Sequence, residues 1–223
     1  MIIDPKTHEV RAKLVLFGLP HSGKHQILEN WSSEQGDGQL LKSQVGDSLV
    51  HRASFKWNHL PQQGWALKIN AYTTEGEVSH SALSEMLLKD ADGVAFVAPV
   101  DGDRAEAIRA NIHELSEILK RHERSLSELP LALHYHQAEK VPGFQAQLLS
   151  DYLGVPRNTV PEVMTRSDDS SPLSASLALL LQQVIKLAEA DLPQDEKGKQ
   201  REQDAAAKTP SPPPSQLAGA EAT

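Results

Sequence analysis

The chain has 223 residues, a formal net charge of −8 and no cysteine. This length allows one domain of ordinary size and a tail, and the lack of cysteine excludes disulfides and thiolate metal sites. The acidic balance argues against general nucleic-acid binding, which needs a basic surface. The sequence shows no apolar run of ~18 residues, no signal-peptide core and no lipidation motif. We therefore expect a cytoplasmic protein without a membrane anchor.

The first third of the chain alternates apolar runs with polar, glycine-containing segments. One apolar run ends at Phe17, and an amphipathic stretch follows Gly23. Two further apolar runs flank a turn that ends at Gly64. Period and turn residues predict the following elements: strands at 11–17, 50–57 and 65–72, a helix at 22–31, and a polar loop at 33–46.

The rest of the folded part continues the alternation. Residues 93–98 form a continuous apolar run, which is typical of a buried parallel strand. Pro161 places the last strand at an edge of the sheet, because proline has no N–H for a second neighbour. The predicted elements are strands at 93–98, 129–135 and 159–164, and helices at 78–89, 104–124, 145–153 and 173–190. This order predicts an α/β fold of three layers, with a mostly parallel sheet between helices.

The composition changes after Leu192. Residues 195–208 are charged and rich in Gln and Ala, and residues 209–215 are a proline cluster. Such a segment has too little apolar surface to offset the entropy of ordering. We therefore predict a folded domain at 1–192 and a disordered tail at 193–223. The proline cluster is either a solvated tail or a polyproline ligand for a partner.

The segment from Gly18 to His25 has the pattern of a phosphate-binding loop between a strand and a helix. Glycines at both ends, Gly18 and Gly23, let backbone N–H groups point inward, and Ser22 lies among them. Lys24 can reach the phosphates, and the start of the helix adds its positive dipole end. The next residue is normally Ser or Thr, whose hydroxyl binds Mg²⁺; here it is His25, and imidazole is a poor ligand for a hard ion.

Two other groups of polar residues suggest chemistry. His134 and His136 lie on one face of a predicted strand, so they are either part of a metal site or ordinary surface or satisfied histidines; we favour the second interpretation. Glu75 and Glu77 form either an acid/base pair or a solvated loop, and the loop is the simpler interpretation.

The order of elements and motifs resembles a Ras-like small GTPase, and most closely its bacterial MglA-like branch, from residue 13 to residue 187. The phosphate loop, the segment 72–77 after the third strand and the run 92–98 carry the resemblance. It implies a Ras-like fold, GTP or GDP as ligand with Mg²⁺, and protein partners. In this family the partners are a roadblock-type regulator and the machinery of motility or cell polarity.

By this resemblance, the phosphate-loop residues, Thr73 and Gly76 would bind nucleotide, the last two as part of the second switch. Glu77 stands where the family has the glutamine that orients the attacking water, so it is the catalytic candidate there. A glutamate also brings negative charge close to the phosphates.

The first switch and the base-recognition motif are matched less closely. Arg52 and Ser54 lie near the family's catalytic arginine and magnesium-binding threonine, with spacing that differs by one residue. The family reads Asn-Lys-x-Asp after its fifth strand, whereas this chain reads His136-Gln137-Ala138-Glu139. Glu139 would take the place of the aspartate that recognises guanine.

The departures at His25, at Glu77 and at His136–Glu139 weaken the handling of metal, water and base, respectively. We therefore predict a degenerate GTPase that acts as an interaction module and hydrolyses GTP weakly or not at all. The alternative is a working GTP switch with slow hydrolysis. An ATP-using P-loop enzyme is the third class and ranks last, because the strand that ends near Asn70 offers no acidic residue for a Walker B site.

Overall fold

The computed structural model describes residues 1–34, 39–46, 48–57, 60, 64–75, 81–100, 104–141, 145–154, 160–166 and 174–192. The side chains of residues 75, 81, 139, 147 and 149 are outside this description. All described residues belong to one unit, Met1–Leu192. The predicted disorder of 193–223 therefore concerns residues outside those described. Within the described part of the chain, no helix is long and apolar enough to cross a membrane.

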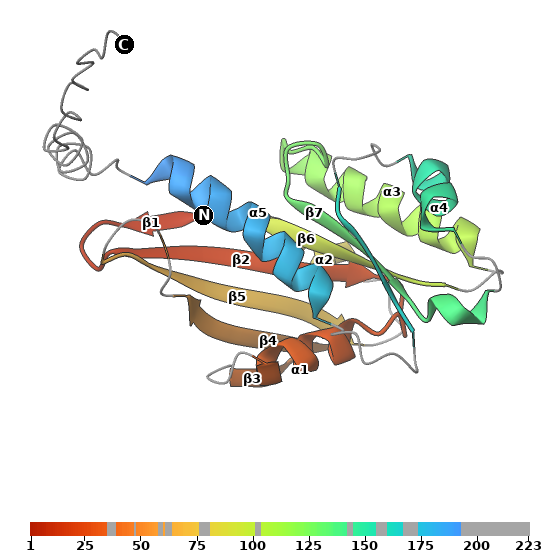
Figure 1. The fold of residues 1–223 in the computed structure, drawn as a ribbon, viewed down its shortest axis with the longest axis horizontal. Helices are drawn as coiled ribbons and strands as arrows, with labels where there is room; N and C mark the ends of the chain where they lie inside the picture. Colours follow the sequence, from red (N-terminus) through yellow and green to blue (C-terminus); the bar gives the residue numbers. More distant parts are fainter. Residues whose placement is uncertain are drawn as a thin grey trace, which may run out of the picture. The chain divides into compact units, whose positions relative to one another are not determined.

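In the described residues, eight strands form a single sheet in the order β3-β4-β5-β2-β6-β7-β8, with β1 pairing on β2 (Figure 1). Pairs β2–β5, β2–β6, β6–β7 and β7–β8 are parallel, and pairs β1–β2, β3–β4 and β4–β5 are antiparallel. The strands are β1 Ile2–Asp4, β2 Glu9–Gly18, β3 Gln39–Val45, β4 Ser48–Trp57, β5 Ala66–Glu75, β6 Gly93–Pro99, β7 Leu131–His136 and β8 Glu162–Thr165.

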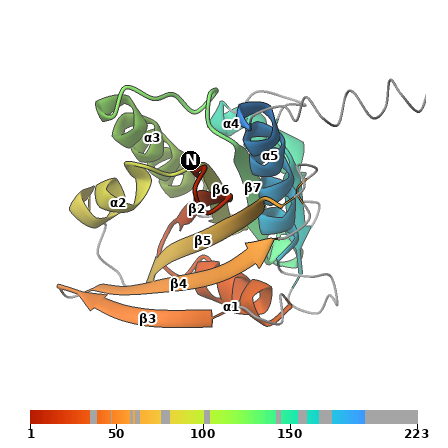
Figure 2. The ribbon, with the colours of Figure 1, turned by 90° about the vertical axis from the view of Figure 1, so that its left-hand side faces the viewer.

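Alternation along the central strand β2 builds two cores. Leu14 and Leu16 point to one face of the sheet, while Val15 and Phe17 point to the other. Helices α1 and α5 pack on the first face, and α2 and α3 pack on the second, with α4 beside α3 (Figure 2). The helices are α1 Lys24–Glu34, α2 Ser81–Leu88, α3 Ala105–Arg121, α4 Ala146–Leu153 and α5 Ala175–Asp191, with a short 3₁₀ helix at Ala138–Lys140. The predicted three-layer α/β class is confirmed.

Helix α3 shows why the sequence pattern predicted the elements correctly. Its buried side chains recur at helical spacing, its first turn carries Glu106, and its last turn carries Lys120 and Arg121, as the helix dipole favours. β6 is buried at every position, as its unbroken apolar run predicts for a parallel strand with helices on both faces.

Two strands were not predicted. The polar loop expected at 33–46 is wrong in its second half, where β3 forms a hairpin with β4 through a turn at Gly46, whose φ is 59°. β3 lacks the apolar alternation of a half-buried strand, because all its residues except Leu40 are exposed. β1 has three residues, too few for any periodic signal.

Candidate functional site

The glycine-bounded loop connects β2 to α1 at the carboxyl ends of the parallel strands, where ligands bind in open α/β sheets. Its two glycines are required by geometry. A Cβ on Gly18 would lie 2.1 Å from the carbonyl oxygen of Val97 on β6. Gly23 has a φ of 88°, and a Cβ there would lie 2.7 Å from Cδ2 of His136. The loop is therefore held close to both β6 and the end of β7.

Lys24 opens α1 and folds back over this loop. Its Nζ donates hydrogen bonds to the carbonyls of Gly18 and Leu19, at 2.9 and 2.6 Å, and lies 3.3 Å from Oγ of Ser22. The side chain is only 7% exposed, and burial lowers the pKa of Lys24 to about 8. A phosphate would supply the negative charge that this amine lacks in the described surroundings.

His25 occupies the position of the magnesium hydroxyl but is engaged elsewhere. Its Nε2 lies 3.0 Å from Oε1 of Glu29, one turn further along α1. Its ring packs on the buried ring of His51 from β4, with centroids 4.0 Å apart and planes inclined by 43°. The His–x₃–Glu spacing on a helix is a signal by which Glu29 could have been found.

The metal expected from the resemblance does not fit these residues. Imidazole is a poor ligand for Mg²⁺, and His25 already contacts Glu29 and His51. Within the described ranges, no group of three metal-binding side chains comes together. We derive no step through a metal ion.

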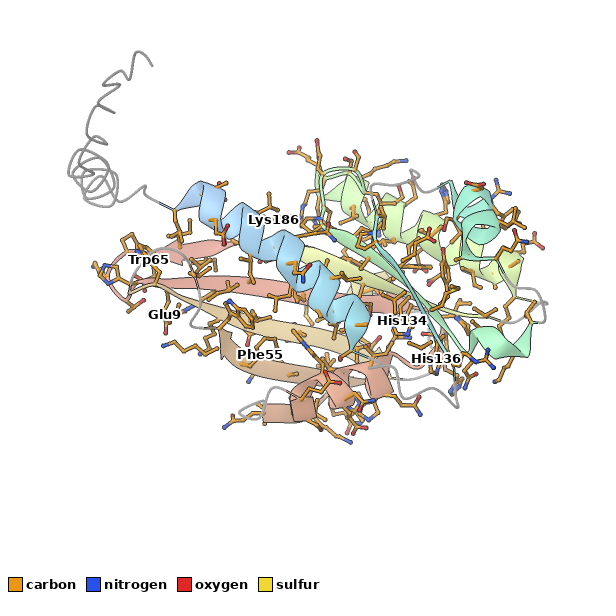
Figure 3. The ribbon with its side chains drawn as sticks, viewed as in Figure 1. Glu9, Phe55, Trp65, His134, His136 and Lys186 are labelled. Carbon is orange, nitrogen blue, oxygen red and sulfur yellow. The ribbon has the colours of Figure 1, made fainter. Side chains whose placement is uncertain are left out.

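At the end of β7 next to the loop, side chains form a buried chain of hydrogen bonds. Nδ1 of His136 lies 3.1 Å from Oγ1 of Thr165, which also lies 2.8 Å from Nε2 of His134. Nδ1 of His134 lies 2.8 Å from Oγ of Ser176 at the start of α5. Figure 3 shows the two histidines next to one another. Both are satisfied core histidines, and Thr165 and Ser176 are partners that sequence reasoning missed.

The protonation state of His134 follows from its burial. Desolvation, with a smaller contribution from His136, lowers the pKa of His134 to about 3. His134 is therefore neutral at physiological pH, with one ring nitrogen as donor and the other as acceptor. The Thr165 hydroxyl can donate to one ring and accept from the other, so a single side chain fixes both histidines.

A pocket of about 330 Å³ lies between the loop and the end of β7. Its volume is at the lower end of the range for small-molecule sites. It is lined by Pro20, His21, Ser22, Gly23, Lys24, His25, Gln26, Thr74, His136 and Gln137. The structure thus brings together the predicted loop residues and the start of the base-recognition segment, and adds Gln26 and Thr74.

Three predicted residues lie away from this pocket. Thr73 is buried, and its hydroxyl donates to the carbonyl of Leu16 at 3.3 Å, whereas its neighbour Thr74 reaches the pocket. Arg52 lies on the sheet face opposite α1, because its neighbour Ala53 packs in the α1 core. Ser54 donates to Oδ1 of Asn70 at 2.6 Å.

The pairing of β4 with β5 explains why Ser54 is far from the phosphate loop. Ser54 is level with Asn70 on β5 and thus with Lys13 on β2. Lys13 precedes Gly18 by five residues, roughly 16 Å along a strand. Gly76, Glu77 and the side chain of Glu139 lie outside the described residues.

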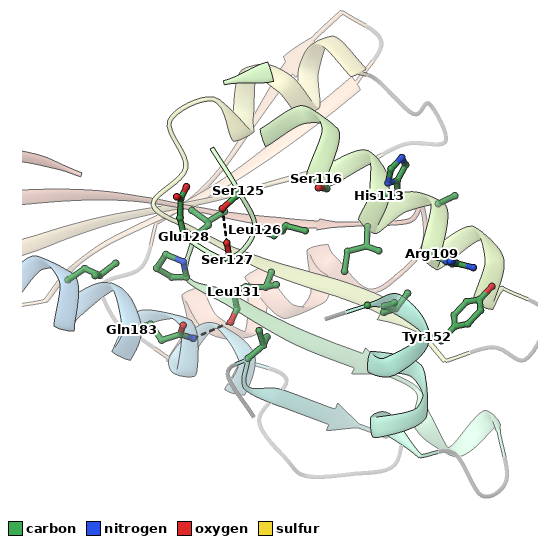
Figure 4. Close-up of a pocket in the computed structure, with 18 of the residues that line it drawn as sticks. Arg109, His113, Ser116, Ser125, Leu126, Ser127, Glu128, Leu131, Tyr152 and Gln183 are labelled. Carbon is green, nitrogen blue, oxygen red and sulfur yellow. Dashed lines mark hydrogen bonds between the residues drawn. The ribbon is translucent and has the colours of Figure 1, made fainter. Parts of the chain in front are cut away.

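A second and larger hollow, of about 1200 Å³, lies at the other end of β7 between α3, α4 and α5 (Figure 4). The N–H of Leu133 donates to the carbonyl of Pro161, but Pro161 has no N–H that could donate to the carbonyl of Leu131. Nε2 of Gln183 on α5 donates to that carbonyl instead, at 3.2 Å. β8 is an edge strand, as Pro161 predicted.

The comparisons with known proteins agree with this architecture. No family model matches the chain. The chain is 25% identical over 141 residues to the mutual gliding-motility protein MglA of Myxococcus xanthus, which covers 61% of this chain and 72% of that protein. The sequence similarity, the mostly parallel α/β sheet and the glycine-bounded loop together support a relationship to the MglA-like branch of the Ras superfamily.

Proposed function

We propose that this chain is a degenerate MglA-like small GTPase, which keeps a phosphate cradle and acts as a protein-interaction module. The similarity to a gliding-motility protein supports a regulatory role in motility or cell polarity. A roadblock-type regulator or a component of the motility machinery is the kind of partner that this relationship implies.

His25 carries the proposal. In a nucleotide switch the residue after the loop lysine holds the metal that bridges the phosphates. Here that residue contacts Glu29 and packs on His51, so α1 is tied to β4 at this point. The substitution has structural partners of its own, which supports a loop that no longer serves metal-dependent catalysis.

The base side supports the same conclusion. His136 packs on Gly23 and bonds to Thr165, so its ring belongs to the buried framework of the loop. The neighbouring Gln137 lines the pocket and adopts a left-handed backbone conformation, with φ of 59°. Selective recognition of guanine has little support from these two residues.

The second candidate is a working GTP switch, and the cradle favours it. Both glycines keep their required conformations, and Lys24 is placed to meet a phosphate. A site that had lost all ligands would have no need for a lysine whose charge is buried, because burying a charge costs stability.

Calorimetric titration with GTP, GDP, ATP and inorganic pyrophosphate, each with and without Mg²⁺, separates the two candidates. The proposal predicts weak binding that depends on the phosphates, hardly distinguishes guanine from adenine and does not need Mg²⁺. Lys24→Met should abolish this binding. His25→Ser restores the usual hydroxyl and should make binding respond to Mg²⁺.

Two results would overturn the proposal in favour of the switch. One is tight, magnesium-dependent binding of GTP but not ATP by the unmodified chain. The other is release of phosphate from GTP at a rate that Lys24→Met abolishes. If no nucleotide or pyrophosphate binds at millimolar concentration, both candidates lose the phosphate cradle and only the interaction role is left.

A further inference from the structure

Among the residues that the structure describes, no strand pairs with the outer edge of β3. β3 pairs with β4 on one side, and it ends the strand order of the sheet (Figure 2). Its side chains Leu41 and Val45 are 42% and 43% exposed and lie on the same face of the sheet. The described part of the chain contains only six other large apolar side chains that are this exposed.

Of the features that usually protect edge strands from pairing, this edge has only a single lysine. β3 contains no proline, and Lys42 is its only charged residue. The register of β3 on β4 is continuous from Gln39 to Val45, so no bulge interrupts the strand. Seven residues in an unbroken strand offer a full row of backbone donors and acceptors.

The sequence of β3 is complementary to itself. We propose that two copies of this chain associate through antiparallel pairing of β3 with β3, about a two-fold axis at Ser43, and form one continuous sheet. Leu41 then lies opposite Val45 of the second copy, and Val45 lies opposite Leu41, as an isologous contact requires. Lys42 lies opposite Gln44, so no like charges face each other.

Other registers satisfy these residues less well. An axis at Lys42 would place the two Lys42 ammonium groups directly opposite each other, which is destabilising. An axis at Leu41 would leave Val45 beyond the paired region. The axis at Ser43 covers both exposed apolar residues, Leu41 and Val45, in both copies. It is therefore the register of the proposed dimer. The pairing does not involve the nucleotide pocket, and it does not depend on the proposed function.

Cross-linking tests the axis directly, because the chain has no cysteine of its own. A cysteine from Ser43→Cys would face its counterpart, with Cβ atoms about 4.5–5.5 Å apart. Gln39→Cys is the matched control on the same exposed strand, and its two copies would lie about 26 Å apart along the paired strands. A short bis-maleimide should link the first variant into dimers and leave the second monomeric.

Charge variants test the register in solution by sedimentation equilibrium. Gln44→Lys places two lysine pairs across the axis and should raise the dimer dissociation constant about 2- to 30-fold. Gln44→Glu creates two Lys–Glu pairs and should lower this constant by a similar factor. The double variant Lys42→Glu with Gln44→Lys restores opposite charges and should dimerise like Gln44→Glu.

A purely monomeric chain up to millimolar concentration would overturn the inference. Equal cross-linking of Ser43→Cys and Gln39→Cys would overturn the register, as would the same dissociation constant for Gln44→Lys and Gln44→Glu. A dimer that none of these substitutions affects would place the interface elsewhere and would also contradict the proposal.

Discussion

Replacement of Gly23 by alanine tests how tightly the phosphate loop is held against the end of β7. The change adds one methyl group at a residue with φ of 88°, and the new Cβ would lie 2.7 Å from Cδ2 and 2.9 Å from Nε2 of His136. His136 has little freedom to withdraw, because Thr165 holds its Nδ1.

The expected cost has two parts. A left-handed conformation costs a non-glycine residue about 1–2 kcal/mol. Overpacking against a buried ring costs about 1–3 kcal/mol more, so Gly23→Ala should lower the free energy of unfolding by about 2–5 kcal/mol. Gly64→Ala is the matched control, since Gly64 has φ of 83° and no atom of the described residues lies within 4 Å of its Cβ position; it should cost only about 1–2 kcal/mol.

Urea unfolding of these variants, followed by circular dichroism, measures the costs. A double-mutant cycle with His136→Ala isolates the contact, because Gly23→Ala should cost less by about 1 kcal/mol or more once the ring is gone. If Gly23→Ala costs the same with and without the ring, or no more than Gly64→Ala, the close packing of the loop on His136 is wrong.

Three further predictions concern charge and buried hydrogen bonds. Because the pKa of Lys24 is lowered to about 8, part of the amine is neutral at pH 8, and a bound anion must recruit a proton. Pyrophosphate binding at pH 8 should therefore take up about half a proton per site, as titrations in buffers of different ionisation enthalpy would show. The binding should weaken as the pH rises further. No uptake, or the same uptake in Lys24→Met, would refute this assignment. Thr165→Val keeps the shape but leaves both histidine rings short of a partner, so it should cost about 1–3 kcal/mol in urea unfolding, and a neutral result would show that the hydroxyl does not bridge the rings. Gln183→Ala removes the donor to the Leu131 carbonyl and should cost about 0.5–1.5 kcal/mol, whereas Gln182→Ala, at the neighbouring exposed position, should cost nothing measurable; equal effects would contradict the role of Gln183.

The fold could be predicted from the sequence wherever the spacing of apolar side chains reflects their burial. The apolar run of β6 and the helical spacing of α3 were sufficient, because each element meets the core along its whole length. β3 gave no such signal, since it is held by backbone pairing with β4 and buries almost nothing. The periodicity of apolar side chains reports contact with a core. It therefore cannot predict a strand that has no core contact.

The site was predictable to the extent that local sequence determines it. Gly18, Gly23 and Lys24 lie within one short loop, so their spacing predicted a tight strand-to-helix loop, which the structure contains. That this loop binds phosphate stays a prediction. The partners of His25 and His136 come from distant segments, and no local pattern could indicate His51 or Thr165. Ser54 shows the reverse error, because a similar sequence position does not specify how far along the sheet a residue lies.

The hydrogen bonds of Lys24 have a consequence for the chain without ligand. Its ammonium donates to the carbonyls of Gly18 and Leu19, so the loop provides acceptors for this ammonium from its own backbone. An incoming phosphate must compete for this ammonium, and the two carbonyls then need new donors. Phosphate binding would thus exchange one set of partners of this ammonium for another, and the proposed cradle would have a stable arrangement of its own. A protein built in this way can present the same surface to a partner whatever the nucleotide supply in its surroundings.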